Sequence, residues 1–162
     1  MKKLLTLNKI FLFSIFLLVI SLDISSKRWI INNLLLFEIQ KLNPILNIFH
    51  IHNYGLAFGF FSEISQKYKY FLLLVDIVTI AAILKIIYLI QINKKYYSFA
   101  YTLIISGAIG NMIDRLYFGF VIDFIDIHIN NWHFATFNVA DISIFLGSIL
   151  VIYIYFLKKE KK

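Results

Sequence analysis

The stretch Ile10–Leu22 reads IFLFSIFLLVISL and contains no charged side chain. A transmembrane helix needs about 20 predominantly apolar residues, so we expect a first span over Leu4–Leu22. Lys9 lies near the entry of this span, where its long side chain can reach the headgroup region. A basic start before an apolar run is also typical of a cleavable signal peptide. Because no small-x-small cleavage site follows, we expect a retained helix.

The composition of the whole chain favours a membrane protein. Its 162 residues are 60% hydrophobic and 15% charged, whereas soluble domains have about 45–50% apolar and about 25% charged residues. Further apolar runs lie at about Tyr70–Ile92, Phe99–Ile113 and Val139–Leu157. We therefore expect a single membrane-embedded domain, residues 1–162, that is all-α with four transmembrane helices. The absence of cysteine excludes disulfides, thiol nucleophiles and Cys-type zinc sites.

The net charge of +7 comes largely from lysines at the ends of the apolar runs. These lysines are Lys2, Lys3, Lys9, Lys94, Lys95, Lys158, Lys159, Lys161 and Lys162. The positive-inside rule places such clusters in the cytoplasm, so both termini and the Lys94 connection are expected there, as an even number of spans requires. A nucleic-acid-binding surface would instead interleave basic residues along one exposed face, so no nucleic-acid partner is expected.

A long segment between the first two spans, Ser25–Lys69, is expected outside the cytoplasm. Residues alternate between two sides over Ile45–His52, a pattern typical of a strand. Asn53 and Gly55 follow among aromatic residues, and glycine there permits a tight turn or a close approach of the backbone to a ligand. We expect a small extracytoplasmic β-sheet that rests on the membrane surface.

The aspartates are the candidate catalytic groups, because ionisable side chains at membrane depth are costly and mark functional sites. Asp76 lies inside the second span. The other five are expected at outer span ends or in outer loops: Asp23, Asp114, Asp123, Asp126 and Asp141. Each alone has a structural interpretation. Asp141 can complement the helix dipole behind an Asn138 N-cap, and Asp114 can pair with Arg115.

The combination of Asp123 and Asp141 favours catalysis. The loop between Leu116 and Asn138 brings Asp123 back toward Asp141. Two carboxyl groups close together in a partly dehydrated site share one proton. One can then take a proton from water while the other protonates the scissile carbonyl. The pair predicts peptide hydrolysis without a metal or cofactor.

Five short motifs follow one another along nearly the whole chain. They are Asp23 with Lys27, Asn53–Phe58 (NYGLAF), Gly110–Leu116 (GNMIDRL), Val121–Phe124 (VIDF) and Phe137–Asp141 (FNVAD). Together and in this order they resemble the motifs of bacterial lipoprotein signal peptidase, or signal peptidase II, a family of aspartic membrane proteases. Ile24 departs from the family pattern, where glutamine is common, but leaves both charged positions of its motif intact.

The resemblance implies cleavage of the signal peptide from diacylglyceryl-modified prolipoproteins, N-terminal to the lipid-modified cysteine. It implies a monomer in the lipid of the bacterial inner membrane, with its site near the extracytoplasmic face. The catalytic dyad would be Asp123 and Asp141. Residues that bind substrate or brace the site would be Asn53, Gly55, Asn111, Asp114, Arg115, Asn138, Asp23 and Lys27.

Physical chemistry indicates roles for some of these residues. We expect Arg115 to hold Asp114 as a fixed, ionised partner. Asn53 and Asn138 either hydrogen-bond the substrate backbone or orient a dyad oxygen, and the sequence leaves both roles open. The sheet around Gly55 is expected to clamp an extended substrate segment, while apolar walls between the helices accept its acyl chains.

Two other functions use different residues. A proton-coupled transporter would also place carboxylates in membrane helices, and Asp76 with Lys85 fits that idea. The two lie about 13 Å apart along a helix, so they do not pair directly, and four spans leave little room for a translocation path. A metalloprotease would use histidine ligands, but the chain has no His-Glu-x-x-His motif. Its histidines are His50, His52, His128 and His133.

Overall fold

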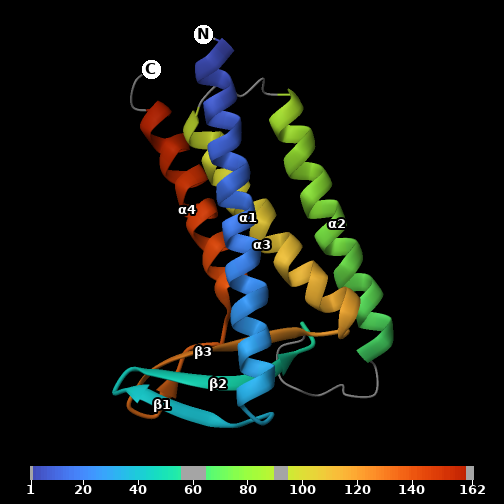
Figure 1. The fold of residues 1–162 in the computed structure, drawn as a ribbon, viewed down its shortest axis with the longest axis vertical. Helices are drawn as coiled ribbons and strands as arrows, with labels where there is room; N and C mark the ends of the chain where they lie inside the picture. Colours follow the sequence, from blue (N-terminus) through green and yellow to red (C-terminus); the bar gives the residue numbers. More distant parts are fainter. Residues whose placement is uncertain (1, 56–64, 90–94, 160–162) are drawn as a thin grey trace.

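A computed structural model of the chain describes residues 2–55, 65–89 and 95–159. It contains the helices α1 (Lys2–Asn33), α2 (Ser65–Leu89), α3 (Lys95–Tyr117) and α4 (Val139–Lys159). A small sheet lies across one end of this bundle, and the start of α1 and the end of α4 lie at the other end (Figure 1). The four expected helices and the expected small sheet are confirmed. Residues 56–58 of the NYGLAF motif and the connection at Lys94 lie outside the described residues.

The helices expose a largely apolar surface. Within the described residues, α1 over Asn8–Asn33 and α4 over Val139–Leu157 are long and apolar enough to cross a membrane. Large side chains on several helices are exposed, including Phe13 at 61%, Phe71 at 59% and Phe145 at 64%. Apolar surface of this extent is unusual for a soluble monomer and fits contact with lipid.

The first helix is longer than the span expected from the sequence. It continues past Leu22 to Asn33, so Asp23 and Lys27 lie inside the helix and not after it. The polar residues from Asp23 onward interrupt the apolar run, which is why an earlier end was expected. In the structure Asp23 and Lys27 are buried against other helices and satisfy one another, so the helix continues.

The sheet has the order β1-β2-β3-β4 and is antiparallel. Its strands are β1 (Ile39–Asn43), β2 (Leu46–Asn53), β3 (Val121–Ile129) and β4 (Trp132–His133). The strand expected over Ile45–His52 is confirmed as β2. The segment between α3 and α4 was expected to be a loop, but it contains β3 and β4. Asp123 therefore sits on a strand, opposite Ile51 of β2.

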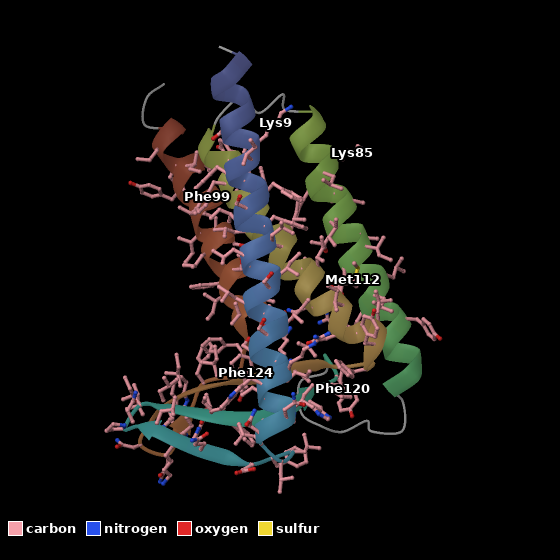
Figure 2. The ribbon with its side chains drawn as sticks, viewed as in Figure 1. Lys9, Lys85, Phe99, Met112, Phe120 and Phe124 are labelled. Carbon is pink, nitrogen blue, oxygen red and sulfur yellow. The ribbon has the colours of Figure 1, made fainter. Side chains whose placement is uncertain are left out.

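A hydrophobic core joins the sheet to the bundle. Its buried members are Ile30 and Leu34 at the end of α1, with Ile122 and Phe124 of β3. Figure 2 shows Phe124 at the sheet end of the molecule, whereas Lys9 and Lys85 lie near the opposite end. The core fixes the height of β3 relative to α1.

The helices α3 and α4 approach each other closely through glycine. A Cβ on Gly107 would overlap the backbone oxygen of Ala140, and a Cβ on Gly147 would meet the backbone oxygen of Ala100. Because Ala140 belongs to the first turn of α4, the contact at Gly107 brings the start of α4 against α3. The first turn of α4 thus lies beside the Asn111 region of α3.

Candidate active site

The two aspartates predicted to form a dyad lie on different elements. Asp123 is on β3 and is 1% exposed, while Asp141 is in the first turn of α4 and is partly exposed. The negative charge of Asp141 acts on Asp123. The fold thus brings together a strand carboxyl and a helix carboxyl, and amide side chains connect them.

Asn138 is the amide that connects the two carboxyl groups. Its Oδ1 accepts a hydrogen bond of 2.9 Å from the backbone N–H of Asp141, and its own N–H donates to Asp141 Oδ2 at 3.2 Å. This reciprocal pair is a capping box, so the expected N-cap is confirmed. The Nδ2 of Asn138 donates to Asp123 Oδ1 at 2.7 Å. A single fully buried residue therefore orients both carboxyl groups.

Two more amides complete the hydrogen bonds to the dyad. Asn111 Nδ2 donates to Asp141 Oδ1 at 2.8 Å, and Asn53 Nδ2 donates to Asp123 Oδ2 at 2.8 Å. Asn53 is itself oriented, because its Oδ1 accepts the N–H of Gly55 at 2.7 Å. Gly55 has a φ of +75°, which a residue with a Cβ rarely adopts. In this structure Asn53 and Asn138 orient dyad oxygens.

A buried ammonium group lies beneath the dyad. The Nζ of Lys27 lies 2.7 Å from Asp23 Oδ2 and 2.9 Å from Asp114 Oδ2, and it donates to Asn111 Oδ1 at 3.1 Å. The Asn111 oxygen thus faces Lys27 while its nitrogen faces Asp141. One lysine of α1 fixes the amide orientation of an α3 residue that contacts the dyad.

The carboxylates that hold Lys27 also hold the backbone next to the dyad. Asp23 Oδ1 accepts the N–H of Ala140 at 2.9 Å, and Asp114 Oδ2 accepts the N–H of Ile122 at 3.1 Å. Each backbone group immediately precedes a dyad residue in the chain. The network therefore fixes the positions of β3 and α4 together.

The expected pair of Asp114 with Arg115 is wrong. Asp114 pairs with Lys27 of α1, and Arg115 Nη1 donates to Asp76 Oδ2 of α2 at 2.7 Å. Neighbouring residues of a helix point about 100° apart, so they reach different helices. Asp76, which the transporter hypothesis associated with Lys85, is thus the partner of Arg115. The sequence signal for this pair was an isolated carboxylate inside an apolar run.

Burial dominates the electrostatics of Asp123. Burial raises its pKa from 3.8 to about 7, the charge of Asp141 adds to this, and the amides of Asn53 and Asn138 oppose it. Removing a carboxyl from water disfavours its charged form. The Asp123 carboxyl is therefore largely protonated below about pH 7.

Asp126 lies further along β3, and its hydrogen bonds are to other residues of the sheet. It accepts hydrogen bonds from Asn47 Nδ2 at 2.8 Å and from the ring of His133 at 2.9 Å. Although burial opposes the change, these bonds lower the pKa of Asp126. Its contacts are those of the structural role considered for it from the sequence.

The chain is similar to known proteins over most of its length. A family model described as signal peptidase (SPase) II matches residues 15–157. The lipoprotein signal peptidase of Buchnera aphidicola subsp. Baizongia pistaciae (strain Bp) is 57% identical over 143 residues, covering 86% of this chain and 88% of that protein. The lipoprotein signal peptidase of Serratia proteamaculans (strain 568) is 39% identical over 144 residues, covering 89% and 85%.

Solved structures of bacterial membrane enzymes have a similar fold. One has a TM-score of 0.79 and 29% identity, and the match covers 93% of this chain and 90% of the other. A second has a TM-score of 0.75 and 30% identity, with coverage of 89% and 91%. The similarity extends over the helices and the sheet.

Proposed function

Because the chain belongs to the signal peptidase II family, a family of membrane peptidases, we propose that it removes the signal peptide from diacylglyceryl-modified prolipoproteins. Cleavage would occur N-terminal to the lipid-modified cysteine. The observation that carries the proposal is the pair of carboxyl groups, Asp123 and Asp141, that Asn138 joins through hydrogen bonds to both. No cofactor is needed for this chemistry.

The surroundings of the two carboxyl groups support different roles for them. Asp141 lies in the first turn of α4, is partly exposed, and accepts hydrogen bonds from Asn111 and Asn138. Asp123 is buried and keeps a proton up to about pH 7. We therefore assign Asp141 as the general base and Asp123 as the general acid.

The proposed reaction has two steps, the attack of water and the collapse of the tetrahedral intermediate. Asp141 takes a proton from a water molecule as the water oxygen attacks the scissile carbonyl carbon, while Asp123 gives its proton to the carbonyl oxygen. The resulting tetrahedral diol collapses as the C–N bond breaks. Asp141 then protonates the leaving amine, and Asp123 regains a proton from the diol. Both carboxyl groups return to their starting states.

The membrane arrangement is part of the proposal. All four helices would span the inner membrane as a single domain, with the sheet resting on the extracytoplasmic surface and the protein working as a monomer. Exposed apolar residues on α2, such as Phe71 and Val78, support lipid contact for that helix. Lys9 and Lys85 lie near the end of the bundle opposite the sheet (Figure 2), which supports a cytoplasmic location for that end.

The test is cleavage of a diacylglyceryl-modified prolipoprotein by the purified full-length protein in detergent. Asp123→Asn and Asp141→Asn should each reduce turnover by at least about 10³-fold, because each removes a group that acts as a unit with the other. Asp126→Asn, on the same strand, is the matched control and should retain turnover. Near-normal turnover in either folded dyad variant would refute the assignment. A strong chelator should have no effect, and loss of activity in chelator would favour a metal mechanism.

A further inference from the structure

Asp76 lies outside every motif that the sequence resemblance uses, yet it contacts a residue of one of them. Its Oδ2 accepts a hydrogen bond of 2.7 Å from Arg115 Nη1, and both side chains are only 15% exposed. An arginine at membrane depth is stable only with a partner or with a path to water. Asp76 supplies that partner, and it joins α2 to the last turn of α3.

Among the described residues, the contact with Asp76 uses one part of the Arg115 guanidinium. Arginine has five N–H donors in a rigid fork, and this contact uses Nη1. The Nε of Arg115 is buried and has no hydrogen-bond partner among the described residues. A buried donor without an acceptor is costly, and an acceptor that enters at the partly exposed guanidinium would lower that cost.

The position of Arg115 places this donor next to the dyad strand. The preceding residue, Asp114, accepts the backbone N–H of Ile122 at 3.1 Å, and Ile122 adjoins Asp123. The backbone oxygen of Arg115 accepts the N–H of Gly119 in the turn that leads to β3. An extended peptide bound across Asp123 would therefore bring main-chain carbonyl groups to this end of α3.

The same face of α2 also supports the other side of the site. Leu72 lies four residues before Asp76, so both side chains share one face of the helix. A Cβ on Gly55 would overlap Leu72 Cδ1, which means that the Asn53–Gly55 segment packs directly against α2. Asn53 in turn donates to Asp123. The contact of Asp76 with Arg115 thus helps to fix the helix on which this segment rests.

We propose that Asp76 is a positioning residue of the peptidase. It holds the partly exposed Arg115 guanidinium against α2 so that the donors not bound to Asp76 are placed for a main-chain carbonyl of the extended substrate. It also keeps the Leu72 face against Gly55. The ligand of the free donors is a peptide carbonyl oxygen, and the inference rests on the proposed function above.

The experiment measures kcat and KM separately for cleavage of a diacylglyceryl-modified prolipoprotein by full-length variants in detergent. Asp76→Asn should raise KM roughly tenfold with kcat within about twofold, because the lost contact is present in both the ground state and the transition state. Asp76→Glu keeps the charge and should restore most of the affinity. Lys85→Gln removes a charge from the same helix far from the site and should leave both constants unchanged.

A double variant in which the two charges are exchanged distinguishes a positioning role of Asp76 from a purely structural role. Asp76→Arg combined with Arg115→Asp keeps an ion pair between α2 and α3, but the guanidinium then comes from α2 instead of α3. Thermal stability should recover relative to Asp76→Asn, while KM stays raised. If the swap restores KM together with stability, the role is merely structural and the proposal is wrong.

The remaining outcomes distinguish this inference from the function on which it rests. Active wild-type protein with an unchanged KM in Asp76→Asn would overturn the positioning role alone. Absence of cleavage by the wild-type protein would overturn both proposals. If Asp76→Asn does not fold, the swap and Asp76→Glu still decide the question, since each retains an ion pair.

Discussion

Asn138 donates a hydrogen bond of 2.7 Å to Asp123, and the same side chain caps the helix that carries Asp141. One amide thereby couples the start of α4 to Asp123, near the start of β3. Its oxygen accepts the N–H of Asp141, and its nitrogen donates to Asp123 and also to Asn111 and the backbone oxygen of Ile122. The two functions can be separated by substitution.

Asn138→Ser should separate the cap from the dyad contact. Serine is a good N-cap, so the start of α4 should be kept and the melting temperature should fall less than in Asn138→Ala. The Asp123 oxygen loses its donor, and kcat should fall by about 10²-fold, as for removal of one preorganised donor. Asn138→Ala should lose both, with a further cost of about 0.5–2 kcal/mol in stability. Full activity in a stable Asn138→Ser protein would show that the donor is dispensable.

The raised pKa of Asp123 predicts how activity and stability depend on pH. The folded protein keeps this proton up to about pH 7, whereas an ordinary aspartate loses it near 3.8. The folded state therefore binds more protons between these values, so its stability is greatest below the lower value and falls as pH rises toward the higher one. Turnover should also fall above about pH 7, because the general acid is then ionised. Melting temperatures of wild type and Asp123→Asn across this range check the slope, which the variant should flatten.

Removal of the buried ammonium should unfold the site. Lys27→Met leaves Asp23 and Asp114 buried without their cation, which typically costs about 3–5 kcal/mol. Lys9→Met removes an exposed lysine from the same helix and is the matched control. Thermal unfolding in detergent should show a large drop for the first variant and little change for the second. Equal stability of the two variants would contradict the network described here.

Close packing of α3 on α4 can be tested at its two glycines. Gly107→Ala would force Ala140 and the start of α4 away from α3, so both kcat and the melting temperature should fall. Gly147→Ala makes a similar contact with Ala100, but further along α4 from the dyad. It should lower the melting temperature with a much smaller effect on kcat. A larger loss of kcat in Gly147→Ala would exclude this explanation.

The cysteine-free sequence offers a clean test of topology. Asn131→Cys in the β3–β4 turn should react with a membrane-impermeant maleimide added to intact spheroplasts. Lys85→Cys, near the other end of the bundle, should react only after the membrane is opened. Labelling of Lys85→Cys from outside would reverse the proposed orientation.

Much of the site was predictable because hydropathy and motif order depend on local sequence. The apolar runs predicted the helices, and Asn138 followed by Asp141 predicted the start of α4. The partners of Arg115 and Asp114 were not predictable in the same way. Those residues are adjacent in sequence but face different helices, so the choice between Asp76 and Lys27 depends on how the helices pack. The extent of α1 was missed for a related reason, since its buried charges are satisfied only by residues distant in sequence.

The length of α1 has a consequence for where the protein cuts. Its 32 residues extend about 48 Å at 1.5 Å per residue, well beyond the roughly 30 Å hydrocarbon thickness of a bilayer. The surplus ends in the core that holds β3, so the helix acts as a strut of fixed length between the lipid and the dyad. Because the length of this helix is fixed, we expect the depth of the two carboxyl groups in the membrane to depend on bilayer thickness. The rate of the reaction should then depend on bilayer thickness as well. A bilayer that is too thin or too thick tilts the helix and, under the proposed function, moves Asp123 and Asp141 relative to a substrate anchored by its acyl chains.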